Sequence, residues 1–387
     1  MSSTTQESSQ SDLILTTGNY ASAEGAIAVG CRYFGGYPIT PSSEIAHYMS
    51  RRLPQVGGTF VQMEDELASI VSVVGASFAG AKAMTATSGP GLSLMAETVG
   101  LAFMLETPLV IVTVMRGGPS TGQPTKASQS DVMQTRYLSH GDYEMIVLSP
   151  NSVQEMYDLT IRAFNLSEKY RSPVIVASDG ITGQMMEPVR YHSDFEVINR
   201  KPPQVPPEDY KPFEVLDEDL IPGMAVAGTE YNFYVTGLTH DVTGSPDMRP
   251  EAAVSLVQRL CDKIRRGRSE INDWKERYVE DAEVVVLSYG INSRGVPEAV
   301  EKARSKGHKV GYVRMRSLWP FPQELMERLA KNDVKKVIVS EMNYGQVIRE
   351  VERFRHLGFS VIGQHVPTTI PFHPSFIYDG IMKEVNP

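Results

Sequence analysis

Short apolar runs alternate with longer amphipathic stretches through the first half of the chain. The predicted strands are residues 59–63, 83–87, 108–115, 143–148 and 173–177. The helices expected around and between them are residues 20–29, 44–52, 92–104 and 152–169. The run 108–115 is almost wholly apolar, which suits a central parallel strand covered on both faces. Strands that alternate with helices predict a doubly wound parallel α/β domain, with ligands bound at the carboxyl ends of the strands.

The alternation stops after residue 180 and resumes near residue 283. Six prolines between 202 and 222 exclude a long helix there and favour an extended connection, although residues 231–236 have a strand-like pattern. Residues 250–279 are expected to form a charged helical stretch. Its apolar stripe would contain Val254, Val257, Leu260 and Ile264, and its charges are expected to form a solvated face.

A second α/β unit is predicted from the later alternation. Its strands would be residues 283–287, 309–315, 336–340 and 360–365, and its helices residues 296–306, 322–331 and 346–354. We therefore expect a disordered tail at residues 1–12 and a first domain at 13–195. A linker at 196–250 would lead to the second domain at 251–387. No nucleophile–base pattern is visible in the second unit, so packing and subunit contact are its favoured roles.

Residues 61–91 form an unusual stretch in which an acidic triplet precedes small residues. Glu64, Asp65 and Glu66 suit the positive N-terminal end of a helix. Small residues such as Gly75 would make this helix thin enough for another backbone to approach it. Residues 88–91 (SGPG) predict a turn after the next strand. The pattern is typical of a helix that holds a ligand against a carboxylate. The alternative is that Glu66 is an exposed first-turn acid that only stabilises the helix dipole.

Composition excludes several classes of protein. The chain of 387 residues has a net charge of −9, whereas a nucleic-acid-binding protein normally has a basic face. Its two cysteines, Cys31 and Cys261, cannot ligate an iron–sulfur cluster alone. Residues 1–12 lack the pattern of a signal peptide, and no apolar run is long enough to span a bilayer. We expect a cytoplasmic protein.

Three motifs together resemble one known family. The spacing from Glu66 to Gly75 resembles the aminopyrimidine-binding helix of thiamine-diphosphate enzymes. Residues 36–44 (GYPITPSSE) and 116–122 (RGGPSTG) are similar to the α subunit of 2-oxoacid:ferredoxin oxidoreductases, particularly the 2-oxoglutarate enzymes. The similarity extends from about Gly18 to the end of the chain. It implies a thiamine-diphosphate-binding, pyrimidine-type domain followed by a transketolase C-terminal-like domain.

The resemblance also implies roles for individual residues. Glu66 would bond the aminopyrimidine ring nitrogen and promote formation of the base that activates the cofactor. Pro38, Ile39 and Thr40 would bind the cofactor, and Thr40 would also contact the substrate, although a helix-capping turn is the alternative for this segment. Arg116 would clamp the carboxylate of a 2-oxoacid, because a guanidinium binds carboxylates through two parallel hydrogen bonds. The alternative is a surface arginine in a loop.

Several parts of a complete thiamine site are missing from the sequence. Residues 178–180 (SDG) match only part of the motif that holds Mg²⁺ and the diphosphate. The resemblance therefore implies a β subunit that carries the diphosphate, Mg²⁺ and a [4Fe-4S] cluster, with γ and δ subunits as further candidates. Lys126 and Arg136 are candidates for binding the second carboxylate of 2-oxoglutarate, and a surface role is the alternative for each.

The implied reaction is oxidative decarboxylation of 2-oxoglutarate with coenzyme A to succinyl-CoA and CO₂, with reduction of ferredoxin. The chain would be active only together with its partner subunits. Two alternatives remain. The enzyme could act on branched-chain or other 2-oxoacids, or the chain could be a catalytically silent scaffold.

Overall fold

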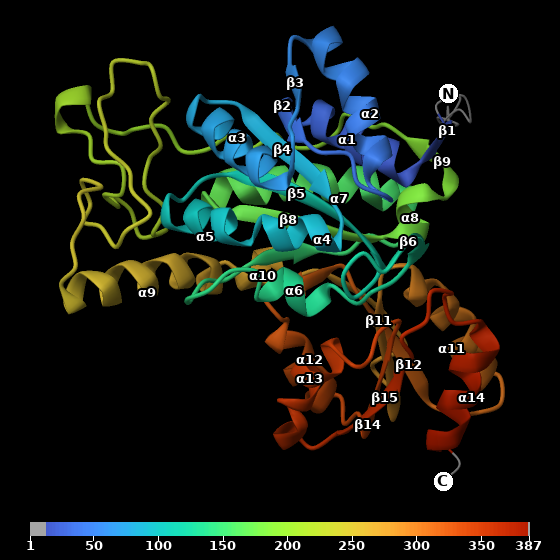
Figure 1. The fold of residues 1–387 in the computed structure, drawn as a ribbon. Helices are drawn as coiled ribbons and strands as arrows, with labels where there is room; N and C mark the ends of the chain where they lie inside the picture. The colour runs from blue at the N-terminus through green and yellow to red at the C-terminus, as the bar shows by residue number, and fades with distance from the viewer. Residues whose placement is uncertain (1–12, 386–387) are drawn as a thin grey trace, which may run out of the picture.

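The computed structural model describes residues 13–385. The tail predicted at residues 1–12 lies outside the described residues. Two α/β units lie one above the other in Figure 1, the upper one coloured blue to green and the lower one orange to red. None of the helices within residues 13–385 is both long and apolar enough to cross a membrane.

The first unit is built on one largely parallel sheet, as predicted. Its strand order is β13-β7-β8-β5-β4-β2-β3, with β6 (Gln123–Ala127) paired antiparallel to β5. The parallel strands are β2 (Cys31–Gly36), β3 (Thr59–Gln62), β4 (Lys82–Thr87), β5 (Leu109–Gly117), β7 (Ile146–Leu148) and β8 (Pro173–Asp179). All of β5 is buried, which confirms the prediction of a central strand covered on both faces.

The helices of this unit cover both faces of the sheet (Figure 1). They are α1 (Gly18–Ala28), α2 (Ser43–Arg52), α3 (Glu66–Phe78), α4 (Gly89–Leu94), α5 (Ala96–Met104), α7 (Val153–Tyr170) and α8 (Gly180–Gln184). Gly25 allows α1 to approach α7 closely, since a Cβ there would lie 2.5 Å from the Tyr157 carbonyl oxygen. The turn predicted at residues 88–91 is wrong, because Gly89–Gly91 already form the first turn of α4. The helix expected at residues 92–104 is correspondingly two helices.

The second unit contains the four predicted strands and three predicted helices, together with further elements. Its sheet has the order β10-β12-β11-β14-β15. These strands are β10 (Trp274–Arg277), β11 (Val284–Tyr289), β12 (Val310–Met315), β14 (Lys336–Glu341) and β15 (Ser360–His365). Helices α11 (Val296–Arg304) and α14 (Pro374–Val385) lie on one side, and α12 (Gln323–Lys331) and α13 (Val347–Glu352) on the other (Figure 1). The short strand β13 (Ser317–Trp319) leaves this unit and pairs antiparallel with β7 of the first sheet.

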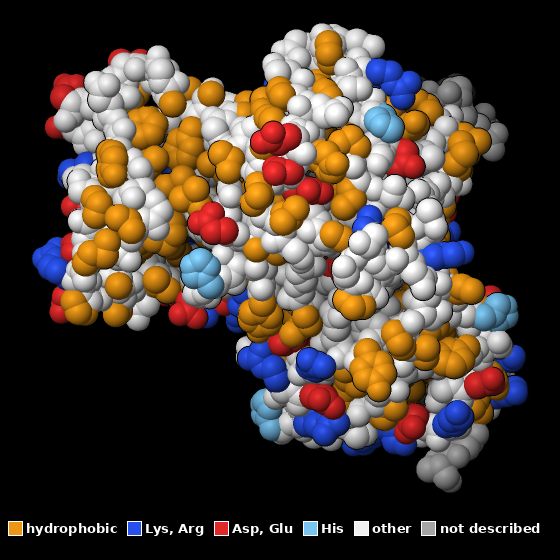
Figure 2. All heavy atoms as spheres, in the orientation of Figure 1, with side chains coloured by type: hydrophobic (Ala, Val, Ile, Leu, Met, Phe, Trp, Pro, Cys, Tyr) orange, Lys and Arg blue, Asp and Glu red, His pale blue; other side chains and the backbone are white. Residues whose placement is uncertain are grey.

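The connection between the two units is extended, as the prolines predicted. After β9 (Met186–Arg190), which pairs antiparallel with β1 (Leu13–Thr17), residues 191–249 contain only the short 3₁₀ turn Pro207–Asp209. The strand predicted at residues 231–236 is wrong, since this stretch pairs with no strand of the described chain. Figure 2 shows hydrophobic side chains gathered over this connection. The exposed ones include Leu216, Val226, Tyr234, Leu238, Val242 and Met248.

The charged helical stretch differs from the prediction in three ways. The helix α9 (Pro250–Arg266) ends before Gly267, and the short α10 (Arg268–Ile271) and β10 follow it. Val254 is exposed rather than part of the buried stripe. Two of the charges are not solvated, because Arg259 and Lys263 form ion pairs with the fully buried Glu106 at 2.6 and 2.8 Å. Burial alone would raise the pKa of Glu106, but these cations hold it well below its usual range.

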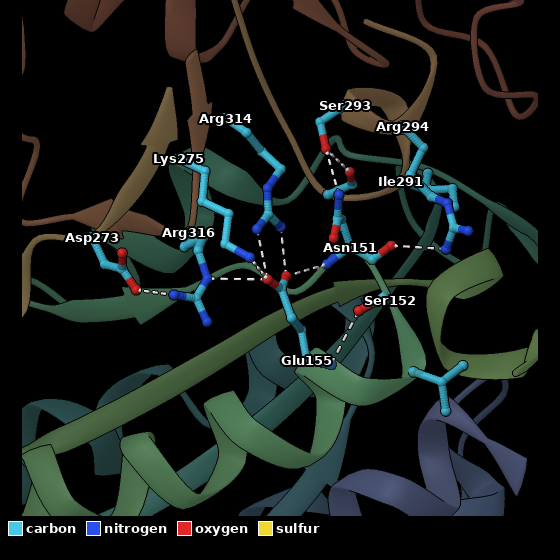
Figure 3. A network of polar contacts seen from close by, with 12 residues as sticks. Asn151, Ser152, Glu155, Asp273, Lys275, Ile291, Ser293, Arg294, Arg314 and Arg316 are labelled. Atoms are coloured by element: carbon cyan, nitrogen blue, oxygen red, sulfur yellow. Dashed lines mark hydrogen bonds and ion pairs between the residues drawn. The ribbon is translucent and has the colours of Figure 1, made fainter. Parts of the chain in front are cut away.

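A second buried ion network fixes the two units to each other (Figure 3). Glu155 of α7 accepts two hydrogen bonds from Arg314 of β12, at 2.5 and 2.6 Å. Arg316 contacts the same carboxylate at 3.1 Å, and its other end pairs with Asp273 at 2.6 Å. Such bidentate pairs fix geometry as well as charge. The network therefore sets the position of the second sheet against the first.

Candidate functional site

The predicted site residues gather at one edge of the first sheet. Strands β2, β3, β4 and β5 run parallel and are neighbours in the sheet, so their carboxyl ends lie together. Residues 38–40 follow β2, Glu66 follows β3, and Arg116 lies at the end of β5. The edge is the one at which ligands bind in open parallel sheets.

Glu66 is the first residue of α3 and is buried. Asp65 occupies the N-cap, and its Oδ1 accepts a hydrogen bond from the Ala68 amide at 2.8 Å. Capping is thus provided by Asp65, whereas Glu64 is exposed. Because Glu66 is only 5% exposed, the alternative of an exposed first-turn acid is wrong. Burial raises the pKa of Glu66, the neighbouring Asp65 raises it further, and the charge of Arg116 acts in the opposite direction.

The start of α4 leaves space for the Glu66 carboxylate. A Cβ on Gly91 would lie 2.4 Å from Glu66 Oε1 and 2.2 Å from Thr87 Oγ1. Only glycine is therefore compatible with this position of the carboxylate. The burial, the raised pKa and the space at Gly91 fit a carboxyl that shares a proton with a ring nitrogen of a ligand.

The close backbone approach expected at the thin helix does not occur at Gly75 within the described chain. Nothing in residues 13–385 lies within 4 Å of a Cβ built on Gly75. The same face of α3 carries the exposed side chains of Leu67 and Val71. The close approach is instead on the sheet side, where a Cβ on Gly35 would lie 2.2 Å from Ser72 Oγ. The Gly75 face of the helix is open.

Arg116 connects the two loops that the sequence singled out. Its Nη1 donates to the Thr40 carbonyl oxygen at 2.7 Å, and its Nη2 donates to the Thr121 carbonyl oxygen at 3.0 Å. The side chain is buried, so the alternative of a surface arginine is wrong. Its Nε is buried and has no hydrogen-bond partner among the described residues. Since a guanidinium has five N–H donors, Arg116 can hold both loops and still bind an anion.

Ser42 occupies the N-cap position of α2, but its side chain makes no capping hydrogen bond. Its hydroxyl donates to the Ile39 carbonyl oxygen at 2.9 Å, which stabilises the turn at residues 39–42. Pro38, Ile39 and Thr40 are partly exposed at the end of β2. The turn thus presents residues 38–40 at the same edge as Glu66.

A cavity of about 480 Å³ opens beside Arg116. It is lined by the loop 117–120, the start of α4, the segment 128–136 and a loop of the second unit. The lining side chains that sequence reasoning missed are Ser93, Ser130, Asp131, Gln134, Tyr344 and Gln346. The cavity therefore lies between the two units, and both contribute to it.

Asp131 is the missed residue with the most distinct chemistry. Its Oδ2 is buried and has no hydrogen-bond partner within residues 13–385. Burial raises the pKa of Asp131 to about 6, against the opposing charge of Arg116. In the sequence it precedes the short helix α6 (Val132–Arg136) and resembles an ordinary N-cap, but its side chain makes no capping bond.

Of the predicted site residues, Arg116 lines this cavity, whereas Glu66 and residues 38–40 do not. The candidates for the second carboxylate and the diphosphate do not reach it either. Arg136 donates to the Tyr143 carbonyl oxygen at 2.8 Å and pairs with Glu144 at 3.1 Å. Lys126 is exposed on β6 and lines a different pocket. Asp179 accepts bonds from the Thr182 and Ile291 amides at 2.9 and 2.8 Å, which is a structural role. The described residues contain no group of three or more potential metal ligands.

The fold and the site together define a thiamine-diphosphate-binding α/β protein, and comparisons with known proteins specify the family. Residues 24–259 match the model described as "Pyruvate flavodoxin/ferredoxin oxidoreductase, thiamine diP-bdg", and residues 282–364 match "Pyruvate:ferredoxin oxidoreductase core domain II". The chain belongs to the 2-oxoacid:ferredoxin oxidoreductase family, as an α subunit resembling those of the 2-oxoglutarate enzymes.

Individual relatives support this assignment. The chain is 56% identical to the 2-oxoglutarate synthase subunit KorA of Methanocaldococcus jannaschii, over 87% of this chain and 90% of the relative. It is 54% identical to the KorA subunit of Methanothermobacter thermautotrophicus, over 87% and 89%. The ketoisovalerate oxidoreductase subunit VorB of Methanothermobacter marburgensis is 39% identical over 87% of this chain and 88% of its own length.

Solved structures agree with the fold. A 2-oxoglutarate:ferredoxin oxidoreductase from Magnetococcus marinus, solved with 2-oxoglutarate, coenzyme A and succinyl-CoA bound, superposes with a TM-score of 0.90 at 39% identity. The match covers 97% of this chain and 66% of that chain, so this chain spans slightly less than two thirds of the solved one. A split-gene transketolase, solved as an inactive tetramer, has a TM-score of 0.54 at 13% identity over 95% of this chain and 96% of its own, which shows the fold alone.

Proposed function

We propose that this chain is the α subunit of an enzyme that oxidatively decarboxylates 2-oxoglutarate with coenzyme A to succinyl-CoA and CO₂ and reduces ferredoxin. The observation that carries the proposal is the buried Glu66 carboxyl, which follows β3 at the same carboxyl-end edge of the parallel sheet at which Arg116 ends β5. The choice of 2-oxoglutarate is supported by the relatives named 2-oxoglutarate synthase subunits, which are 44–56% identical to this chain, against 39% for a ketoisovalerate subunit.

Thiamine diphosphate, when bound, supplies the nucleophilic carbon that adds to the substrate ketone. Glu66 would hold a proton at the cofactor's ring nitrogen, and positioned acid–base groups are typically worth ~10²–10⁴ in rate. Arg116 would bind the substrate carboxylate through the N–H donors that the Thr40 and Thr121 carbonyls leave free. Pro38, Ile39 and Thr40 would contact the cofactor, with Thr40 also facing the substrate.

The proposal includes a partner that completes the site. A β subunit would supply the diphosphate-binding half, Mg²⁺ and a [4Fe-4S] cluster, and γ and δ subunits are further candidates. The open face of α3, with exposed Leu67 and Val71 next to Gly75, supports contact with such a partner. The relatives' designation as subunits also supports a multi-subunit complex. A cytosolic location is part of the same proposal.

The test is to purify the chain with its partner subunits and to assay reduction of ferredoxin or a viologen dye. Turnover would be compared for 2-oxoglutarate, 2-oxoisovalerate and pyruvate, with and without thiamine diphosphate and coenzyme A. We expect the highest kcat/KM with 2-oxoglutarate, and no activity or cluster absorbance for the isolated chain. A preference for 2-oxoisovalerate would favour the branched-chain alternative. Undiminished turnover of a complex carrying Arg116→Ala would favour a scaffold.

A further inference from the structure

The second unit holds the segment 128–133 in place through its backbone and its glutamine side chain. The Gln129 side chain donates to the Tyr289 carbonyl oxygen and accepts from the Met342 amide, each at 2.9 Å. The remaining bonds join Asn343 to the Gln129 carbonyl oxygen, Gln346 to the Ser130 carbonyl oxygen and the Met133 amide, and Trp319 to the Val132 carbonyl oxygen. Residues on both sides of Asp131 are therefore held in place by hydrogen bonds to the second unit.

The Asp131 side chain is the exception within this fixed segment. Its carboxyl lines the cavity beside Arg116, and its Oδ2 is buried without a partner in the described chain. A Cβ on Gly89 would lie 2.8 Å from that oxygen, so the first residue of α4 leaves room for it. A buried polar atom without a partner costs free energy, which points to a ligand that completes its hydrogen bonding.

The charge that acts on Asp131 in this cavity comes from one neighbouring side chain. Arg116 on β5 is the one basic residue among those that line the cavity within residues 13–385. The other elements packed around it present neutral groups: Gly89 and Ser93 of α4, Gln134 of α6, and Tyr344 and Gln346 of the second unit. With the pKa of Asp131 raised to about 6 by burial, a protonated Asp131 and Arg116 would be two hydrogen-bond donors on one cavity.

We infer that Asp131 is a substrate-facing residue of this site: its neutral carboxyl donates a hydrogen bond to the carboxylate of the anionic 2-oxoacid that Arg116 binds, and its ionised form repels that carboxylate. The inference rests on the proposed function. Under this inference, the segment 128–133 that the second unit fixes takes part directly in substrate binding. This role is additional to the packing role expected for the second unit.

The consequence is an affinity that falls as pH rises through the pKa of Asp131. If only the neutral form binds, the apparent dissociation constant rises up to ~50-fold between pH 6 and pH 8, because the binding-competent fraction falls by that factor. Asp131→Asn keeps a donor of the same size without a charge. Its affinity should therefore be nearly independent of pH over this range.

The experiment uses the assembled complex as wild type, as Asp131→Asn, and as the control Asp142→Asn, which changes an exposed aspartate on a nearby loop. KM and kcat for 2-oxoglutarate are measured separately at pH 6, 7 and 8. Calorimetric titration with glutarate, an unreactive dicarboxylate, is run at pH 7 in buffers of different ionisation enthalpy to count protons taken up. We expect proton uptake in the wild type and the control and none in Asp131→Asn, with a flattened KM profile only in Asp131→Asn.

Parallel KM profiles in wild type and Asp131→Asn, or glutarate binding without proton uptake in the wild type, would overturn the inference. A fall in the affinity of Asp131→Asn of the same size at every pH would also overturn it, because that result would mean that Asp131 only supports the position of Arg116. If Asp131→Asn does not assemble, the wild-type proton uptake decides alone. A complex that turns over no 2-oxoacid but still shows Asp131-dependent proton uptake would support the inference and remove the proposed function.

Discussion

Two arginines in this molecule are equally buried but differ in how completely their bonds are satisfied. Arg314 and Arg116 are each 7% exposed. Arg314 gives both of its hydrogen bonds to the Glu155 carboxylate (Figure 3). Arg116 bonds only backbone carbonyls, its Nε has no partner in residues 13–385, and Asp131 nearby also lacks one. Burial alone therefore does not distinguish the two arginines. What distinguishes Arg116 is a buried donor without a partner that lies beside a cavity.

The acids of the two regions differ in the same way. Burial would raise the pKa of Glu155, but its bonds to Arg314 outweigh that effect and lower it. Burial raises the pKa values of Glu66 and Asp131, and the more distant charge of Arg116 does not compensate. The pKa values are therefore raised for the two acids of the candidate site and lowered for Glu155 of the ion network. The pKa of the structural Asp179 is also raised by burial, so the shift alone does not define a site.

The largest expected effect is in the satisfied region. Arg314→Ala leaves Glu155 buried without its main partner, and breaking such a pair costs roughly 3–5 kcal/mol of unfolding free energy. The exposed pair of Arg277 with Glu301 is the control, because Arg277→Ala should change stability by less than about 1 kcal/mol. Denaturant unfolding of the purified chain measures both. Equal losses in the two variants would contradict the comparison.

The next effect concerns Arg116. Arg116→Ala removes the cation that we propose binds the substrate carboxylate, and truncating one partner of a desolvated pair costs roughly 2–5 kcal/mol. We expect a loss of that size in kcat/KM of the assembled complex. Arg116→Lys should restore only part of it, since an ammonium cannot bond both the Thr40 and Thr121 carbonyls as the planar fork does. An unchanged specificity constant in the alanine variant would exclude a substrate role.

A smaller effect of opposite sign is expected at Asp131. Its folded-state pKa is raised to about 6, so stability is fully present below the unfolded value near 4 and is lost as pH rises through 6. Asp131→Asn should therefore stabilise the chain by about 1–3 kcal/mol at pH 8 and by almost nothing at pH 3.5. Thermal unfolding at the two pH values measures the difference. Glu155→Gln, in which a lowered pKa is removed, should instead destabilise the chain at pH 8.

The smallest effects are expected at the neighbours of Glu66. Glu64 is exposed, and Asp65 caps the helix through the Ala68 amide. Glu64→Gln and Asp65→Asn should each cost a few tenths to about 1 kcal/mol of stability, the usual contribution of a charge or cap at a helix N-terminus. Turnover should change little in either variant. An inactive Glu64→Gln complex would show that the carboxylate used by the enzyme is not Glu66.

Local sequence pattern was sufficient for the features that depend on neighbouring residues. The parallel sheet and the burial of β5 follow from this pattern. The position of Glu66 and Arg116 on one edge of the sheet follows because the carboxyl ends of β3 and β5 lie there. Asp131 could not be found in this way. Its position depends on Tyr289 and Gln346, residues far away in the chain, and its local pattern is that of a helix cap.

The errors of sequence interpretation have similar causes. Arg259 and Lys263 look solvent-facing on a helix pattern, but Glu106, more than 150 positions earlier, draws them into the interior. Residues 231–236 have the apolar alternation of a strand, yet no neighbouring strand among the described residues offers them a partner. Hydrophobic periodicity does not show which residues, far apart in the sequence, become partners in the fold.

The most direct test measures turnover and unfolding temperature for Glu66→Gln and Glu155→Gln side by side. We expect the Glu66→Gln complex to assemble and to retain thiamine diphosphate, but to lose at least ~10²-fold in kcat. Its unfolding temperature should equal or exceed that of the wild type. We expect Glu155→Gln to unfold at a lower temperature, with kcat reduced far less. Near-wild-type turnover of Glu66→Gln would contradict the proposal that the buried Glu66 carboxyl takes part in catalysis.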